Sequence, residues 1–276
     1  MTEEVKENGT QFEGKETYVK DVFTEIAAYY DEMNEIMSMH TIEKWHAYMM
    51  KLAGDISGKK CIDIGTGTGR IAFHVAKCAG PEGTVIGVDL TPAMVELAKE
   101  QQTKEGLPTV IDFQVGNALD LQFEEGSFDL ATSGYMLRNV TDIQKCLSEM
   151  YRVLRPGGKV VVAEMATPDN RVIRYFYNLY MNKRVRRIAR KYDKGESIDG
   201  RQPAYDWLAD SIKGFPHGQV MADKFSAAGF TDVKYHNKMF GACCIYEGTK
   251  PLRDRIYSFL GRFRMIRASR VIADNG

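Results

Sequence analysis

Three closely spaced glycines and a later aspartate are the residues of this chain best suited to bind a nucleoside. The glycines are Gly65, Gly67 and Gly69, within the run Cys61-Ile-Asp-Ile-Gly-Thr-Gly-Thr-Gly-Arg70, and Asp89 ends the apolar run Val85-Ile-Gly-Val-Asp89. Glycines let a backbone turn sharply and approach a ligand closely. A carboxylate at the tip of the next strand can accept two hydrogen bonds from ribose hydroxyls. The pattern therefore predicts a site for a nucleoside-bearing cofactor.

The spacing of the glycines separates two classes of cofactor. A dinucleotide-binding turn has the spacing G-x-G-x-x-G and places the pyrophosphate at a helix N-terminus. Here the spacing is G-x-G-x-G, and Asp63 precedes it inside the strand. This pattern resembles the first motif of S-adenosylmethionine (SAM) methyltransferases. Asp63 would repel a pyrophosphate but could face the ammonium of a methionine moiety, so SAM is the predicted cofactor and a dinucleotide-dependent oxidoreductase is a distant alternative.

Several further segments resemble the ubiquinone/menaquinone biosynthesis C-methyltransferase family, over about Val22 to Lys250. They are Tyr30-Asp-Glu-Met-Asn-Glu-Ile-Met-Ser38 with Trp45, Leu137-Arg-Asn-Val-Thr-Asp142, Tyr151-Arg-Val-Leu-Arg-Pro-Gly-Gly158, and Tyr205–Pro216 followed by Ala228-Gly-Phe230. The resemblance implies a SAM-dependent C-methyltransferase of quinone biosynthesis. Its acceptor would be a prenylated quinol, of the demethylmenaquinol or ubiquinol-precursor type, or a related hydrophobic ring.

The resemblance also implies which residues touch the acceptor and the cofactor. Arg138 could steady a developing oxyanion and Asn139 could hydrogen-bond a ring oxygen, while Tyr30 could close the pocket. Arg138 could instead bridge the start of a helix, and Tyr30 could be a core residue. The predicted cofactor contacts are Asp63, Gly65, Thr66, Gly67, Thr68, Gly69, Asp89, Leu90, Met94, Asn117, Ala118, Ser133 and Gly134. No metal is expected.

Three positions depart from the pattern of that family. Arg70 follows the glycines where the family usually has an acid, Met136 replaces a glycine before Leu-Arg-Asn, and His40 lies further from Trp45 than the family histidine does. Arg70 and Met136 keep open a SAM-dependent methyltransferase of a small soluble metabolite, with a C, N or O acceptor. A non-catalytic SAM-binding scaffold is a third hypothesis. His40 and His217 are candidates for a general base.

The composition is typical of a soluble globular protein, with 276 residues, 44% hydrophobic and 27% charged. A net charge of zero gives no field that attracts nucleic acid. No apolar run approaches the roughly 20 residues needed to span a bilayer, and the polar N-terminus is not a signal or transit peptide. The five cysteines lack metal spacing and are interpreted as reduced thiols, mostly core filler. A cytoplasmic location is expected, with contact to a membrane surface left open.

The elements that position these residues alternate along the chain. Strands are predicted at 60–64, 84–89, 110–115, 128–132 and 158–165, with helices near 69–79, 92–105 and 142–154 and a tight turn at Pro156-Gly157-Gly158. A helix over 218–228 and two strands, 231–239 and 242–247, follow, and these strands must pair antiparallel. We therefore predict an α/β fold: a doubly wound, Rossmann-like, seven-stranded sheet with an antiparallel last strand, the class I SAM methyltransferase fold.

Three segments lie outside this alternation. Residues 1–52 are predicted to form a helical cap, with 1–16 frayed, and 169–217 a helical lid within the 53–250 domain, both over the active site. The lid aromatics could line a prenyl tunnel and its basic run could touch anionic headgroups, or the lid could be a core-facing helix with a solvated face. Residues 251–276 are predicted to form a basic amphipathic extension, and we expect its apolar face to pack on protein rather than on membrane. A hydrophobic acceptor, a peripheral membrane contact and a homodimer are the partners considered.

Overall fold

A computed structural model describes residues 14–192, 200 and 203–252. Its centre is a seven-stranded sheet in the order β3-β2-β1-β4-β5-β7-β6. The strands are β1 Lys60–Ile64, β2 Thr84–Asp89, β3 Ile111–Val115, β4 Phe128–Gly134, β5 Leu154–Met165, β6 Thr231–Lys238 and β7 Cys243–Thr249. Strands β1 to β5 pair in parallel, and β7 runs antiparallel to both of its neighbours, β5 and β6. The predicted fold class is confirmed.

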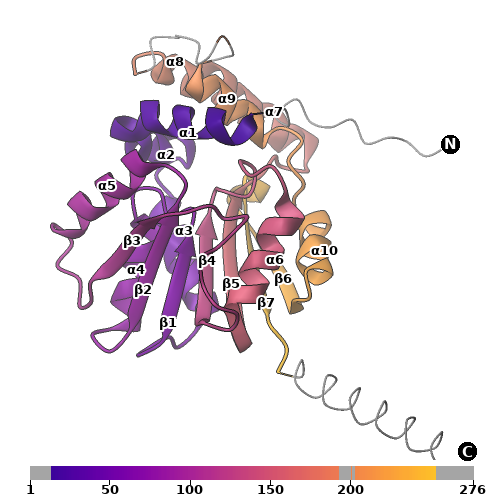
Figure 1. The fold of residues 1–276 in the computed structure, drawn as a ribbon. Coiled ribbons are helices and arrows are strands. Elements are labelled where there is room, and N and C mark those ends of the chain that lie inside the picture. The colour runs from indigo at the N-terminus through magenta and orange to yellow at the C-terminus, as the bar shows by residue number, and fades with distance from the viewer. Residues whose placement is uncertain (1–13, 193–199, 201–202, 253–276) are drawn as a thin grey trace, which may run out of the picture.

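Helices cover both faces of this sheet (Figure 1). The helices are α1 Lys15–Ile26, α2 Tyr30–Met37, α3 Ile42–Ala53, α4 Arg70–Ala79, α5 Pro92–Gln102, α6 Ile143–Val153, α7 Arg171–Leu179, α8 Arg186–Ala189, α9 Ala204–Ile212 and α10 Gln219–Ala227. Successive residues of a strand point to opposite faces of the sheet. Cys61 therefore packs in a core with α3 and α4, whereas its neighbours Ile62 and Ile64 pack in a second core with α6 and α10.

One strand is longer than the sequence suggested. β5 begins at Leu154, which pairs with Phe128, and the next pair is Lys159 with Leu130. The tight turn predicted at Pro156–Gly158 is therefore wrong: these residues form an irregularity inside β5, where Gly157 has a φ of +82°. Glycine accepts that left-handed conformation without steric cost, so the strand continues past the irregularity.

The cap and the lid meet above the carboxyl ends of the parallel strands (Figure 1). The rings of Tyr18 on α1 and Trp207 on α9 form an edge-to-face contact with centroids 5.7 Å apart. A π-helical turn, Tyr180–Val185, joins α7 to α8. Cap and lid thus share one hydrophobic core with the sheet face that carries α3 and α4.

The cysteines agree with the interpretation as free thiols. All five are unpaired, and only Cys78 is exposed. Within the described residues, no helix has the length and apolar character to cross a bilayer. The amphipathic extension predicted over 251–276 falls almost entirely outside those residues.

Candidate active site

The glycine turn lies between β1 and α4 and has the backbone conformation that glycine favours. Gly65, Gly67 and Gly69 have φ values of +70°, +55° and +89°. A Cβ atom on Gly65 would lie 2.4 Å from Cγ of Met136, so a side chain at this position would also clash. The turn therefore needs glycine both for its conformation and for its close packing.

Asp89 ends β2, next to β1 in the sheet, and holds the glycine turn directly. Its Oδ2 accepts a hydrogen bond from the Gly67 N–H at 2.8 Å, and its Oδ1 accepts one from the Thr91 N–H at 2.9 Å. Burial raises the pKa of Asp89 above its ordinary value. Hydrogen bonds from Thr91, Gly67 and Leu90 oppose that rise, and a carboxylate has about four acceptor positions, so ribose hydroxyls of a nucleoside would share Asp89 with these donors.

A pocket opens above the turn, with about 690 Å³ of empty space, part of it open to solvent. Nine of the predicted site residues line it: Tyr30, Gly65, Gly67, Asp89, Leu90, Asn117, Ala118, Gly134 and Asn139. The bare backbone of the glycine turn and the carboxylate of Asp89 in the pocket wall fit SAM, whose ribose would lie at Asp89 and adenine near Asn117.

The remaining predicted residues lie outside the wall of this pocket. Asp63 is buried, and its two oxygens accept hydrogen bonds from Thr66 Oγ1 and Thr132 Oγ1, each at 2.7 Å. Burial raises the pKa of Asp63 to about 6. Ser133 Oγ donates to the Ile64 carbonyl at 2.6 Å. Gly69 and Met94 do not line the larger pocket either, whereas Thr66 and Thr68 line a smaller adjoining pocket. Asp63 therefore stabilises the glycine turn through its hydrogen bond with Thr66 and does not line the larger pocket.

Arg138 is held by a buried ion pair. Its Nη1 donates to Glu164 Oε2 at 2.9 Å, and the other Glu164 oxygen accepts from the Leu137 N–H at 2.5 Å. Both side chains are almost completely buried. Burial raises the pKa of Glu164, and the Arg138 charge opposes that rise. The glutamate on β5 thus holds the loop that follows β4, and no sequence pattern indicated that Glu164 would be the partner of Arg138.

Unpartnered polar atoms gather around Arg138. Within the described residues, Arg138 Nε, Asn139 Oδ1, Tyr135 Oη and Tyr177 Oη are buried without a hydrogen-bond partner. The Arg138 charge acts on the pKa of Tyr30, Tyr135 and Tyr177, which places all three phenols near it. Buried polar atoms are normally paired, so this cluster is suited to a ligand oxygen.

Tyr135 and Tyr177 were missed as site residues. Tyr135 has a φ of +60°, a strained conformation that is frequent at functional sites. Its place directly after Gly134 could have drawn attention to it. Tyr177 lies on α7, within the aromatic run of the lid, and nothing in that run separates it from its exposed neighbours.

Helix α1 supplies part of the pocket wall. Glu16, Val19 and Phe23 line the pocket, and the Asn117 amide lies 3.4 Å from the Glu16 carboxylate. Lys15 Nζ donates to the carbonyls of Val140 at 2.8 Å and Arg138 at 3.3 Å. Burial lowers the pKa of Lys15 to about 8. The expectation that residues up to 16 are frayed is therefore wrong for Lys15 and Glu16, because tertiary contacts override the polar composition.

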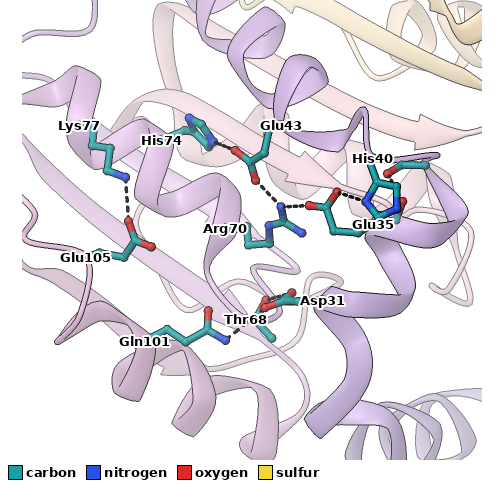
Figure 2. A network of polar contacts seen from close by, with 11 residues as sticks. Asp31, Glu35, His40, Glu43, Thr68, Arg70, His74, Lys77, Gln101 and Glu105 are labelled. Atoms are coloured by element: carbon teal, nitrogen blue, oxygen red, sulfur yellow. Dashed lines mark hydrogen bonds and ion pairs between the residues drawn. The ribbon is translucent and has the colours of Figure 1, made fainter. Parts of the chain in front are cut away.

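Arg70 belongs to a polar network that joins the cap to the glycine turn (Figure 2). Its guanidinium contacts the carboxylates of Glu35 and Glu43, and Thr68 Oγ1 donates to Asp31 Oδ1 at 2.7 Å. Arg70 is thus directed at the cap, away from the larger pocket.

Neither candidate base lies in the pocket wall. His40 is exposed, with its Nδ1 3.6 Å from Glu35, and His217 Nε2 lies 3.0 Å from Asp169. Within the described lining of the larger pocket, the titratable side chains are Glu16, Tyr30, Asp89 and Tyr135.

Solved structures share this fold at low sequence identity. A SAM-dependent methyltransferase of Thermotoga maritima, described as a possible histamine N-methyltransferase, is 20% identical with a TM-score of 0.55, over 83% of this chain and 98% of that one. A SAM-dependent methyltransferase from Aquifex aeolicus is 16% identical with a TM-score of 0.53, over 74% of this chain and 89% of that one.

Sequence relatives give a closer assignment. A demethylmenaquinone methyltransferase of Lactococcus lactis is 35% identical over 247 residues, which are 90% of this chain and 95% of the relative. The ubiquinone/menaquinone biosynthesis C-methyltransferase UbiE of Dinoroseobacter shibae is 34% identical over 232 residues, 84% of this chain and 90% of the relative. The sequence model of the ubiE/COQ5 methyltransferase family matches residues 11–250. The chain therefore belongs to the ubiE/COQ5 methyltransferase family and is a SAM-dependent methyltransferase.

Proposed function

We propose that this enzyme methylates a ring carbon of a prenylated hydroquinone. The observation that carries the proposal is the placement of Asn139 in the wall of the cofactor pocket, next in sequence to Arg138, which forms a buried ion pair with Glu164. The names of two relatives, demethylmenaquinone methyltransferase and ubiquinone/menaquinone biosynthesis C-methyltransferase, also support a quinol as the acceptor. A hydroquinone becomes electron-rich at its ring carbons when one hydroxyl loses its proton, and a nearby guanidinium favours that charge.

SAM supplies an electrophilic methyl group on a positive sulfur. The protein's task is to hold an acceptor carbon in line with that group at about 3–3.5 Å, where proximity contributes several kcal/mol. Asp89 and the glycine turn orient the nucleoside end of the cofactor. Val19, Phe23, Met136 and Val140 give the pocket an apolar wall that suits a hydrophobic ring.

Two groups are suited to hold the acceptor oxygen. The guanidinium of Arg138, which lies outside the described pocket wall, would stabilise a phenolate that reaches it, and its Nε–H has no partner within the described residues. Burial raises the pKa of Tyr30, so this phenol keeps its proton at neutral pH and serves as a hydrogen-bond donor rather than as a base.

The direct test is a methylation assay with the full-length protein, SAM and a reduced short-chain demethylnaphthoquinone. The expected product is the ring-methylated quinol, identified by mass spectrometry together with S-adenosylhomocysteine. Methylation only of water-soluble compounds from a cell extract would instead favour the small-metabolite hypothesis. Absence of S-adenosylhomocysteine with every extract would favour a scaffold.

The small-metabolite hypothesis rested on Arg70 and Met136. Arg70 contacts Glu35 and Glu43, so its charge offers the larger pocket no site for an anionic metabolite. Met136 adds an apolar side chain to the pocket wall. Neither residue now supports that alternative over a hydrophobic acceptor.

We also propose that α7 lies on an anionic membrane surface. Val172, Tyr175, Phe176 and Leu179 follow each other at helical spacing on one face of α7 and are 65, 66, 62 and 38% exposed. The exposed cations that follow on the lid are Lys183, Arg184, Arg187 and Arg190. An apolar helix face beside clustered cations is suited to the boundary of anionic headgroups and acyl chains, where a prenylated acceptor resides.

Liposome sedimentation tests this contact. The double substitution Tyr175→Ser and Phe176→Ser should abolish binding to vesicles rich in anionic lipid, and salt should weaken the wild-type binding. Val110→Ser is the control, because Val110 is 80% exposed and precedes β3, at the edge of the sheet opposite to β6. Binding that survives the α7 substitutions would contradict the proposal.

A further inference from the structure

His46 on α3 is a buried histidine whose ring nitrogens are both free. The residue is 1% exposed, and within the described residues neither Nδ1 nor Nε2 has a hydrogen-bond partner. Its side chain lines the smaller pocket beside the glycine turn. An imidazole that is buried without any partner is unusual and calls for a ligand.

Two further metal-ligating side chains face it. His74 on α4 has its ring centroid 5.5 Å from that of His46, and its Nε2 lies 2.8 Å from Glu43 Oε2. Glu43 and His46 lie three residues apart on α3 and so share one helix face. One ligand atom from each of the three residues lies within 4.8 Å of the other two.

This geometry is close to that of a metal centre. In a tetrahedral site with bonds of about 2.0–2.2 Å, two ligand atoms lie about 3.3–3.6 Å apart, so a separation of up to 4.8 Å must shorten by about 1 Å, which a change of side-chain torsion angles can supply. Two histidines and one carboxylate are a ligand set suited to zinc and its neighbours in the first transition row.

The charges around the three ligands also favour a cation. Arg70 contacts both Glu35 and Glu43, so two carboxylates surround one guanidinium and leave one negative charge in excess. The Arg70 contact uses Glu43 Oε1, and Oε2 faces His74. Arg70 thus orients the carboxylate in the way that outer-sphere partners orient metal ligands.

We propose that Glu43, His46 and His74 bind one divalent transition-metal ion of the zinc class. The ion would tie α3 of the cap to α4, the helix that begins at the glycine turn. Glu43 and His74 are partly exposed, which gives the ion a path from solvent and leaves a coordination position for water. Its role is structural, because these three side chains lie outside the wall of the larger pocket. This proposal departs from the sequence expectation of no metal.

The test is calorimetric titration of chelator-treated, full-length protein with ZnCl₂. We expect binding of one equivalent and a higher melting temperature, and a visible absorption band of tetrahedral type with CoCl₂. His46→Gln, His74→Gln and Glu43→Gln should each weaken binding by about tenfold or more. His217→Ala is the matched control, because its side chain is as exposed as that of His74 and lies 3.0 Å from Asp169.

Zinc affinity that is unchanged in His74→Gln and Glu43→Gln, or that falls equally in His217→Ala, would overturn the proposal, as would the absence of one-equivalent binding. His46→Gln alters the core and could unfold the cap, so its SAM affinity is measured in parallel. His74 and Glu43 are partly exposed, and their variants decide the outcome whatever the fate of His46→Gln.

Discussion

Asp89 joins the glycine turn to the cofactor, and its substitution tests the position of the ribose. Asp89→Ala removes a charged acceptor of hydrogen bonds that contribute about 1.5–3 kcal/mol. We expect SAM affinity to fall by about 10- to 150-fold in calorimetry, with the fold retained by circular dichroism. Asp89→Asn keeps one acceptor oxygen and should lose less. An unchanged dissociation constant in Asp89→Ala would mean that the ribose lies elsewhere.

Arg138 is assigned to the acceptor, so its loss should act on turnover far more than on SAM affinity. Arg138→Met alone leaves Glu164 buried without its partner, which destabilises a protein by about 3–5 kcal/mol when the carboxylate stays charged. The double variant Arg138→Met/Glu164→Gln avoids that unpaired charge. We expect it to fold and to bind SAM normally but to lose turnover by orders of magnitude in single-turnover assays. Loss of SAM affinity with intact turnover would reverse the assignment.

Among the secondary-structure elements, the sheet and the helices that cover it could be predicted from the alternation of apolar runs with helical segments that end at a glycine. The glycine turn and Asp89 could be placed because their function depends on local sequence. Lys15, Glu164 and Tyr177 could not, since each reaches the site only through packing between elements far apart in the chain. The irregularity in β5 was not predicted, for the same reason. A proline followed by two glycines predicts a turn, and only pairing with the neighbouring strand β4 keeps these residues within a strand.

Lys15 attaches α1 to the loop after β4, and this attachment should depend on pH. Its pKa is about 8 in the folded protein, below the ordinary 10.5, because burial penalises the charge. Between these pH values the undocked lysine binds more protons than the docked one, so docking of α1 strengthens as pH rises from about 8 to 10.5. Lys15→Met lacks this titration.

The measurement is the melting temperature of wild type and Lys15→Met across that window. We expect the melting temperature of the wild type to increase relative to that of Lys15→Met as the pH rises. Lys20→Met, on an exposed face of the same helix, is the control and should follow the wild type. A constant difference from pH 7 to 10 would show that Lys15 does not titrate in the folded state.

At the scale of the whole molecule, the C-terminal extension gives the clearest test of assembly. The spacing of Leu252, Ile256, Phe259, Leu260 and Phe263 predicts that they share one helical face, although all but Leu252 lie outside the described residues. Each large apolar side chain contributes about 1.5–3 kcal/mol when buried, so protein is expected to cover this face. Lys250 pairs with the β5 irregularity through the Gly157 and Gly158 backbone, so a truncation should begin after Leu252.

Deletion of residues 253–276 is expected to lower the melting temperature or to dissociate an oligomer, measured by calorimetry and light scattering. Liposome binding should persist, because α7 remains. Salt-sensitive liposome binding that is lost on this deletion would assign the membrane contact to the extension instead.

The place of α1 in the pocket wall has a consequence for how the molecule is made. The two hydrogen bonds of Lys15 join residues 123 and 125 positions apart, and Tyr18 contacts Trp207, which is 189 positions later in the chain. During synthesis α1 therefore leaves the ribosome long before these partners exist. Contacts this distant in sequence form late, after local ones. A nascent chain would thus complete most of its sheet while its cofactor pocket still lacks one wall, and the ability to retain SAM would be among the last properties it acquires.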